Sequence, residues 1–236
     1  MISSVLTKLA AGKRWDIDDS PQYFPQICEN PEAFVTWKDV EKCLNNPQFY
    51  DIQFISKHGD GYMTVPAWRR PWGKDFTPDV KDIVETFQNG NSIIINNFEY
   101  MDGKQDLLSQ IEAYFPDIRA AFHVYCGVEG SKSFEIHEDF AHNFILQVDG
   151  ETNWKVYNNR CSYLCHDHPP NKYSHEDLDC VIDVVMQPGD MLYIPARCYH
   201  QAQPLGKRLS ISIPMVHPEF AGPEMKFMER KYYGIC

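Results

Sequence analysis

The sequence lacks the features of a membrane or secreted protein. Nowhere do about 18 apolar residues follow one another, so no transmembrane helix is expected. The segment before Trp15 has no apolar stretch of the kind found in secretory signal peptides. The eight cysteines form no recognisable disulfide framework, and we interpret them as mostly reduced thiols. These absences predict a cytoplasmic protein with no membrane partner.

Positive charge is also scarce. The chain has 22 Lys and Arg against 33 Asp and Glu, which gives a formal net charge of −11. A broad phosphate-binding surface needs clustered Lys and Arg, so a nucleic acid partner is not expected. A local basic groove remains compatible with this composition.

Internal repeats and low-complexity tracts are absent as well. Apolar residues make up 43% of the chain and aromatic residues 14%, which is enough for a sizeable core. A length of 236 residues suits one domain, which we divide into three parts. Residues 1–118 are predicted to pack on a barrel, residues 119–215 to form the barrel and catalytic core, and residues 216–236 to form a short tail.

The first of these parts is predicted to mix helices and strands. Residues 1–30 are expected to be irregular. Helical spacing, with Thr36 as a cap for the first helix, predicts helices at 34–45, 79–89 and 104–115. Apolar runs predict strands at 53–56, 62–65 and 92–96.

From residue 119 onward, short β-rich runs follow one another. They are separated by Gly and Pro, and they read AAFHVYC, FEIHEDF, NFILQVDG, TNWKVYN, VIDVVMQPGD, MLYIPA and RLSISIPM. Several short strands with regular turns indicate a sandwich or a barrel. Together with the metal-binding residues described next, this pattern favours a mainly β fold with flanking helices, a double-stranded β-helix or cupin-type jelly roll.

One constellation of residues points to metal chemistry. His137 and Asp139 form a His-x-Asp pair, and His200 follows about sixty residues later, after GDMLYIPARCY. Two imidazoles and one carboxylate can hold one face of a ferrous ion and leave the other face open for a cosubstrate and O₂. If FEIHEDF is a strand, His137 and Asp139 point to one face, and His200 would come from the opposing sheet. The alternative is that all three are ordinary polar residues at strand ends.

The stretches HEDFAHNFILQVDGETNWKVY and QPGDMLYIPARCYHQA make a resemblance specific. They resemble the JmjC-type 2-oxoglutarate oxygenases, in particular the cupin-like protein hydroxylases that include the ribosomal oxygenases. The family pattern has His-x-Asp, an Asn-Phe pair, Gln-x-x-Gly and Trp, and then Gly-Asp-x-Leu-Tyr-Ile-Pro before the distal His. The resemblance is clear over about residues 120–215.

This resemblance implies cofactors and an activity. Fe(II) would be held by His137, Asp139 and His200, with 2-oxoglutarate as cosubstrate and O₂ as oxidant. The implied activity is hydroxylation of a protein or peptide side chain, with release of succinate and CO₂. Two alternatives stay open: a hydroxylase of a small metabolite, free amino acid or modified nucleoside, and a cupin that binds metal without turnover.

The sequence departs from the family at one position. The family usually binds the far carboxylate of 2-oxoglutarate with a Lys fifteen residues after the first His, and that position is Thr152 here. Because a dianion in a barrel needs a cationic partner, Arg208 on the strand after the distal His is the better candidate. Ser210 shares its strand face, and Ser210 or Thr152 would add a hydrogen bond. Lys155 has the opposite parity and should face outward. The alternative for Arg208 is a solvated strand-end residue.

Three further residues correspond to family positions near the cosubstrate. Tyr125 matches the Tyr of an Asn-x-Tyr pair, and His123 replaces its Asn. Asn143 resembles an Asn on the cosubstrate side. The alternative for Tyr125 and His123 is that both are core strand residues. Trp154 is interpreted as core packing.

Two segments outside this pattern are open to more than one interpretation. Cys161, Cys165, His166 and His168 are close enough in sequence to bind zinc, but the segment also reads as a loop over the barrel mouth. The stretch AWRRPWGK (67–74) could hold an acidic or aromatic segment, or simply pack on the barrel.

The end of the chain bears on the oligomeric state. The ribosomal oxygenases carry a dimerisation region and a winged-helix domain after the barrel, whereas about twenty residues follow SIPM here. A monomer or weak homodimer is therefore expected.

Overall fold

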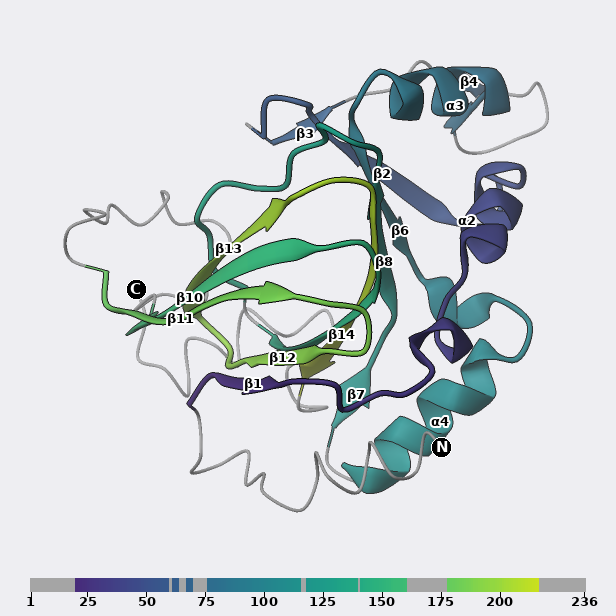
Figure 1. Ribbon diagram of the computed structural model, residues 1–236. Helices are drawn as coiled ribbons and strands as arrows, with labels where there is room; N and C mark the ends of the chain where they lie inside the picture. The colour runs from purple at the N-terminus through teal and green to yellow at the C-terminus, as the bar shows by residue number, and fades with distance from the viewer. Residues whose placement is uncertain are drawn as a thin grey trace, which may run out of the picture.

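Two facing antiparallel sheets form the centre of the protein. The computed structural model describes residues 20–59, 61–63, 67–69, 76–115, 118–139, 141–160 and 178–216. Figure 1 shows the smaller sheet facing part of the larger one, so that the strands enclose a barrel. This arrangement confirms the predicted double-stranded β-helix with flanking helices.

The larger sheet has nine strands. In sheet order they are β1 (Gln22–Phe24), β12 (Met191–Ile194), β9 (His142–Asp149), β14 (Arg208–Val216), β8 (His123–Gly127), β6 (Ser92–Asn96), β2 (Asp51–Ile55) and β3 (Tyr62–Met63), and β7 (Arg119–Ala120) pairs with β14. The sheet crosses the predicted division at residue 118, because β6 pairs with β8 and β1 pairs with β12. The first part of the chain therefore extends the barrel sheet as well as covering it.

The smaller sheet has three strands. Their order is β11 (Cys180–Met186), β10 (Thr152–Arg160) and β13 (Cys198–Pro204), and a separate two-stranded sheet joins β4 (Ala67–Arg69) to β5 (Phe76–Pro78). Side chains of β10, β11 and β13 meet those of β9 and β12 in a core between the sheets, which contains Ile145, Trp154, Val156, Met186, Leu192, Ile194, Cys198 and Ala202. Alternation along each strand places every second residue in this core.

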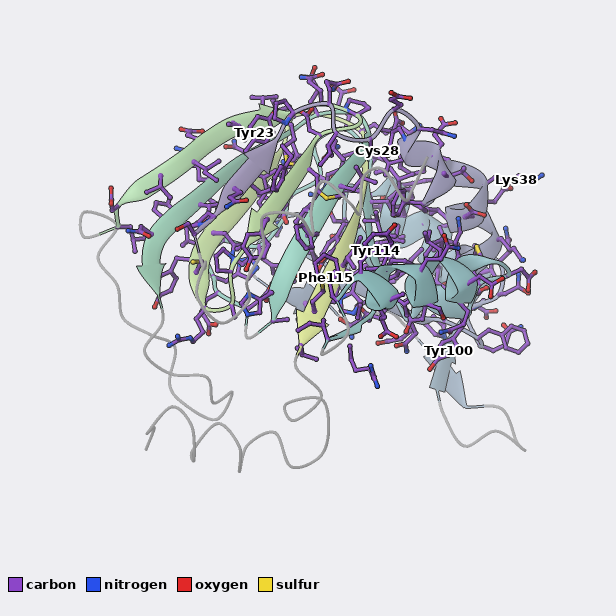
Figure 2. The ribbon with its side chains drawn as sticks, turned by 90° about the horizontal axis from the view of Figure 1, so that it is seen from below. Tyr23, Cys28, Lys38, Tyr100, Tyr114 and Phe115 are labelled. Atoms are coloured by element: carbon purple, nitrogen blue, oxygen red, sulfur yellow. The ribbon has the colours of Figure 1, made fainter. Side chains whose placement is uncertain are left out.

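Helices cover the other face of the larger sheet. Figure 1 shows α2 (Trp37–Leu44), α3 (Val80–Gln88) and α4 (Lys104–Tyr114) on the side of β2, β6 and β8 that faces away from β10, β11 and β13. The α2 helix begins with a capping box, in which the side chains of Thr36 and Asp39 each accept a backbone N–H of the other residue. Figure 2 shows Phe115, just after α4, lying against the strands, and its ring contacts that of Phe144 at a centroid distance of 6.2 Å. Two short 3₁₀ helices, η1 (Pro31–Ala33) and η2 (Phe98–Tyr100), complete the described elements.

A tight turn after β9 explains the Gln-x-x-Gly pattern. The Gln147 side chain donates hydrogen bonds to the carbonyl oxygens of Asp149 and Gly150, at 2.9 and 3.1 Å. Gly150 has a φ of +69°, and any Cβ there would collide with the carbonyl oxygen of Lys207. The turn therefore requires Gly, and it places the start of β10 beside the start of β14.

Two local predictions were wrong. Residues 1–30 were expected to be irregular, but Gln22–Phe24 form β1 along the edge strand β12. FEIHEDF was expected to be a strand, but only His137 forms a bridge, with His200. The preceding residues pack elsewhere: Ser92 donates to the carbonyl of Lys132, and a Cβ on Gly59 would lie 2.8 Å from the carbonyl oxygen of Ser133. These contacts hold the residues before FEIHEDF against β6 and the β2–β3 turn, and FEIHEDF meets β13 through the bridge between His137 and His200.

A buried carboxylate ties β1 to the barrel. Asp190 is 2% exposed and accepts hydrogen bonds from the Tyr23 hydroxyl, the Gln26 backbone and side chain, and the Gln187 backbone. Burial opposes ionisation of Asp190, but these bonds together outweigh it and hold the pKa of the carboxyl below its ordinary value. Burial and the bond to Asp190 raise the pKa of Tyr23 to about 12, so the phenol stays a donor.

Changing Asp190 to Ala should lower the free energy of unfolding by about 3 kcal/mol, because several donors lose one buried, charged acceptor at once. Chemical denaturation at neutral pH measures this difference. Since the pKa is depressed in the folded protein, the stabilisation is present above the unfolded value and lost as the pH falls through the folded one. The difference between wild type and variant should therefore shrink in acid. Asp102→Asn, at a side chain 94% exposed, is the control and should leave stability unchanged. An equal effect in both variants would contradict the prediction.

Among the described residues no helix combines the length and the apolar character needed to cross a membrane.

Candidate metal centre

Three side chains from distant parts of the chain meet at one mouth of the barrel. His137 and Asp139 lie in the segment between β8 and β9, and His200 lies on β13. One potential ligand atom from each lies within 4.8 Å of the others. Paired backbone hydrogen bonds between His137 and His200, at 3.1 and 2.8 Å, set this proximity, and the Arg197 N–H donates to the Asp139 carbonyl at 2.7 Å. A single bridge therefore replaces the expected strand, and the predicted convergence of the three residues is confirmed.

Both histidines are oriented by backbone carbonyls. The Nδ1 atom of His137 lies 2.8 Å from the Glu135 oxygen, and the Nδ1 atom of His200 lies 2.8 Å from the Cys198 oxygen. A carbonyl can only accept, so each Nδ1 carries a proton, and in the neutral ring each Nε2 then presents a lone pair. This is the tautomer that a metal-binding histidine needs.

The electrostatics of the site favour a cation. His200 is buried, and burial together with the neighbouring His137 lowers the pKa of its imidazole, which keeps the ring neutral. Its Nε2 lies 3.6 Å from an oxygen of Asp139, whose side chain is 44% exposed. Two imidazoles and one carboxylate thus face a common point that is open to solvent on the Asp139 side. The donor set fits a divalent ion of the Fe(II) type.

Asn143 connects the Asp139 carboxylate to the sheet. The Asn143 amide donates to Asp139 Oδ2 at 2.9 Å, and its oxygen accepts from the Ser212 hydroxyl at 3.0 Å. Asn143 and Ser212 are both buried. The chain of bonds therefore runs from β14 through β9 to the carboxylate and fixes its orientation. Asn143 therefore contacts a prospective metal ligand, and it does not line the cavity around Arg208.

Changing Asn143 to Ala should weaken metal binding by about 10- to 100-fold, because groups that orient a ligand usually have effects of this size. Titration of the metal-free protein with Mn(II) measures the affinity without any turnover. Asn153→Ala is a matched control, since the Asn153 amide bonds Asp183 at 2.9 Å on the outer sheet. The positioning role would be refuted if Asn143→Ala bound Mn(II) as tightly as Asn153→Ala.

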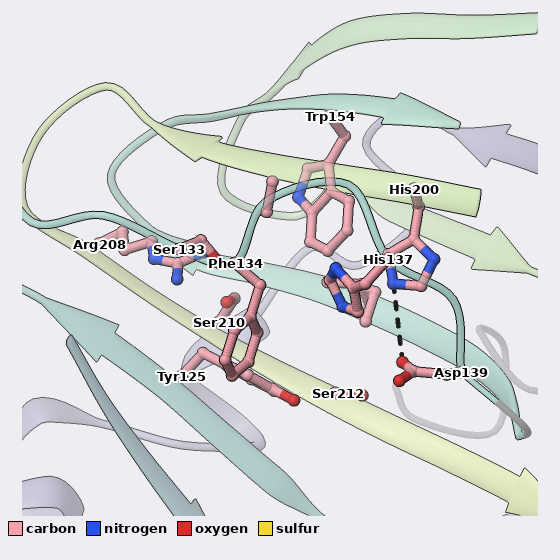
Figure 3. Close-up of a pocket in the computed structure, with 12 residues that line it drawn as sticks. Tyr125, Ser133, Phe134, His137, Asp139, Trp154, His200, Arg208, Ser210 and Ser212 are labelled. Carbon is pink, nitrogen blue, oxygen red and sulfur yellow. Dashed lines mark ion pairs between the residues drawn. The ribbon is translucent and has the colours of Figure 1, made fainter. Parts of the chain in front are cut away.

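A cavity beside the triad is also lined by the buried guanidinium of Arg208. Arg208 is 1% exposed, and its Nε and Nη2 atoms have no hydrogen-bond partner among the described residues. Burial lowers the pKa of this guanidinium to about 10, so it remains charged at neutral pH. A buried, unpaired charge is strongly unfavourable, and a bound anion would relieve it. Figure 3 shows Arg208 and Ser210 on one side of the cavity, with His137, His200 and Asp139 on the other.

Trp154 also faces this cavity, which the sequence interpretation as core packing did not anticipate. Trp154 is 7% exposed and its indole stacks at 6.1 Å from the His200 ring, but its Nε1–H has no acceptor among the residues that the structure describes. The indole is therefore a second buried donor available to an anion. The sequence did carry a signal for this position, because Trp154 lies two residues after Thr152 and the side chains of both therefore point to the same face of the strand.

The enclosed space is small. It measures about 30 Å³, roughly the room of one water, so a dicarboxylate can enter only if a lining side chain moves. Phe134 is a half-buried, apolar lining residue outside any strand, and its ring packs edge-on against Tyr62 and His137 at 5.1 and 5.3 Å. Rotation of Phe134 is the simplest way to widen the cavity.

The remaining predicted residues have different positions. Tyr125 lines this cavity and two neighbouring ones, whereas His123 and Asn143 line only a neighbouring one. Thr152 is fully buried with an unpartnered hydroxyl but does not line the cavity around Arg208. Lys155 points outward as predicted, with its side chain 42% exposed and 3.7 Å from Asp183.

Some predicted features lie outside the described residues. These are Cys161, Cys165, His166 and His168, together with most of the 67–74 stretch, of which only the backbone of β4 is described.

The fold and the site together define a class of protein: a double-stranded β-helix with two histidines and one carboxylate converging at its mouth. Solved structures share the fold. The ribosomal oxygenase YcfD from Escherichia coli superposes with a TM-score of 0.59 at 17% identity, covering 84% of this chain and 50% of that one. A YcfD structure in complex with cobalt and 2-oxoglutarate has a TM-score of 0.56 at 18% identity, covering 92% of this chain and 55% of that one.

Curated relatives share the sequence pattern. The bifunctional lysine-specific demethylase and histidyl-hydroxylase NO66 of Drosophila persimilis is 32% identical over 171 residues, which cover 71% of this chain and 24% of that protein. Ribosomal oxygenase 1 of Danio rerio is 32% identical over 130 residues, covering 54% and 24%. The aligned part spans about a quarter of these relatives. The JmjC domain model matches residues 94–222, more than half of the 236 residues, so the chain belongs to the JmjC domain family.

Proposed function

We propose that this protein is an Fe(II)- and 2-oxoglutarate-dependent oxygenase that hydroxylates a side chain of a protein or peptide. The observation that carries the proposal is the pairing of two features in one cavity. One is a triad whose histidines both present Nε2, and the other is a buried guanidinium with no counter-ion among the described residues. Membership of the JmjC family and the names of the relatives, which include histidyl-hydroxylase and ribosomal oxygenase, support it.

The residues of the triad suit the metal. His137, Asp139 and His200 would hold Fe(II) on one face, and the solvent-facing side would take cosubstrate and O₂. With both bound, a site of this class couples oxidative decarboxylation of 2-oxoglutarate, to succinate and CO₂, to insertion of the second oxygen atom of O₂ into a C–H bond. The protein binds and orients the reactants and excludes bulk water.

The residues opposite the triad suit the cosubstrate. Arg208 would bind the far carboxylate bidentately, and Ser210 and the Trp154 indole would donate further hydrogen bonds. The Tyr125 hydroxyl stays protonated because burial raises its pKa, so it can also donate. Contacts of Thr152 and His123 with 2-oxoglutarate stay predictions, since neither residue lines this cavity.

The small volume around Arg208 keeps a second function open. A protein whose cavity holds about one water could bind metal without turning over 2-oxoglutarate. A hydroxylase of a small metabolite is the alternative within the enzyme class, and it requires the same triad.

Succinate formation separates these functions. The full chain is incubated with Fe(II), 2-oxoglutarate and air, and succinate is quantified by mass spectrometry. Succinate should appear above the protein-free background, disappear on metal chelation and return when Fe(II) is added back. Metal binding with no succinate, in the presence of peptide mixtures or of small-metabolite extracts, would establish the non-catalytic reading.

A further inference from the structure

Two larger cavities meet at the metal ligand Asp139. One has a volume of about 430 Å³ and is lined by residues of β2, β6, β8, β9 and β14, including Asp51, Asn96 and His123. The other has a volume of about 400 Å³ and is lined by the β2–β3 turn and the segment before His137, including Glu135. Tyr62, Tyr125 and Asp139 line both. We call the two cavities together the cleft, and each of them an arm.

The shape of the cleft favours a chain over a compact molecule. Each arm alone is as large as many small-ligand sites, and both open from the point where the metal would be bound. A ligand that fills both arms must extend in two directions from the reacting group. A polypeptide segment that presents one side chain to Asp139 has this form, whereas a free amino acid or small metabolite would fill only one arm.

The charge of the cleft is one-sided. Among the described residues that line it, Asp51, Glu135 and Asp139 are acidic and none is Lys or Arg. Burial is the largest cause of the raised pKa of Tyr62, and the nearby carboxylates of Asp139 and Asp51 raise it further because they place negative charge beside the phenol. A bound metal would neutralise Asp139 but neither of the other two carboxylates.

The two outer carboxylates are held in place without being neutralised. Asp51 accepts hydrogen bonds from the amides of Asn96 and Gln53, at 3.0 and 3.3 Å, and Glu135 accepts one from the amide of Gln201 at 3.2 Å. Elsewhere in the described part of the protein, carboxylates pair with lysines, as in Lys42–Asp102, Lys104–Asp39, Lys155–Asp183 and Lys207–Asp149. Amides orient a carboxylate but leave its charge available to a ligand.

We propose that the cleft selects a polypeptide segment with positive charge on both sides of the presented residue, with Asp51 binding a cationic side chain in one arm and Glu135 in the other. This inference rests on the proposed function, since it names the substrate class of the same site. The net charge of −11 would also attract such a segment from a distance, but only the two carboxylates distinguish the cleft from the rest of the surface.

Peptide binding to the full chain tests the inference without turnover. The protein is loaded with Zn(II) and 2-oxoglutarate, and binding of fluorescent 11-residue peptides is followed by anisotropy. Each peptide pool has a randomised central residue and flanks of Gly and Ser with either Lys, Gln or Glu. The Lys pool should bind at least about ten-fold more tightly than the Gln pool, and the Glu pool most weakly.

Variants of equal net charge locate the effect. Asp51→Asn and Glu135→Gln keep an acceptor for their amide donors, and each should weaken Lys-pool binding about five-fold, with nearly additive effects when combined. Asp102→Asn makes the same change in net charge outside the cleft and should have no effect. Asp51→Lys should shift the preference toward the Glu pool. Equal binding of the Lys and Gln pools, or an equal loss in Asp102→Asn, would overturn the inference.

Failure of this inference can be told from failure of the proposed function. Succinate formation by the wild-type protein with Fe(II) is measured in parallel. Succinate without charge-dependent peptide binding would refute the cleft and leave the oxygenase. Charge-dependent binding without succinate would support the cleft and refute the oxygenase.

Discussion

Changing Asp139 to Ala should abolish succinate formation and reduce metal binding below detection. The variant removes the single carboxylate of the triad, and the two imidazoles of His137 and His200 cannot replace it. The fold should persist, because Asp139 is partly exposed and its deletion removes no core volume. Mn(II) titration measures the metal binding and a thermal unfolding curve measures the persistence of the fold, both on the same sample.

The matched control for this change is Asp183→Ala. Asp183 lies on β11, is also partly exposed and pairs with Lys155 of β10, so its loss changes the net charge equally at a distance from the triad. It should bind Mn(II) like the wild type. If Asp139→Ala retains normal metal content and activity, the assignment of the triad is wrong.

Changing Arg208 to Ala should raise the dissociation constant for 2-oxoglutarate by about thirty-fold or more. Loss of a buried, charge-assisted interaction usually costs about 2–5 kcal/mol, and each 1.4 kcal/mol is a factor of ten. Calorimetric titration of the Mn(II)-loaded protein measures the affinity directly. Lys155→Ala should change it little, because that side chain pairs with Asp183 outside the barrel.

A second consequence concerns stability. Because the guanidinium is buried with two unpartnered nitrogens, Arg208→Met should keep the volume, remove the uncompensated charge and make the ligand-free protein more stable to unfolding. The same variant should lose 2-oxoglutarate binding. Thr152→Lys on the Arg208→Ala background places a cation at the position used by the family and should restore part of the affinity. Unchanged 2-oxoglutarate binding in both Arg208 variants would show that the anchor lies elsewhere.

The local pattern of the chain predicted most of the strands and helices. The helix capped by Thr36 and the strand at 92–96 were found at or within a few residues of the predicted positions, because their apolar spacing is repeated and their ends carry capping or turn residues. β1 was missed, since a three-residue strand has too few residues to show alternation. The interpretation of FEIHEDF as a strand failed because the residues just before it are held by tertiary contacts with β6 and the β2–β3 turn, and FEIHEDF pairs with β13 by a bridge at His137.

The chemistry of the site was partly readable in advance. The two-residue spacing of His137 and Asp139 and the later His200 predicted the triad, because a metal requires those ligand types whatever the backbone does between them. The outward direction of Lys155 followed from strand parity. The link from Ser212 through Asn143 to Asp139 joins residues 69 and four positions apart, and no local pattern connects them.

By itself, the sequence determined the kinds of ligand, the alternation of strands that builds a double-stranded β-helix, and the absence of a lysine at residue 152. Only the tertiary structure decided that, within the described part of the chain, Arg208 is buried without a counter-ion and the Trp154 indole N–H has no acceptor, and that two acid-lined arms meet at Asp139. The physical reason is that side-chain chemistry and local periodicity are properties of neighbouring residues. Burial, unsatisfied hydrogen bonds and cavity shape arise only when strands distant in the chain pack together.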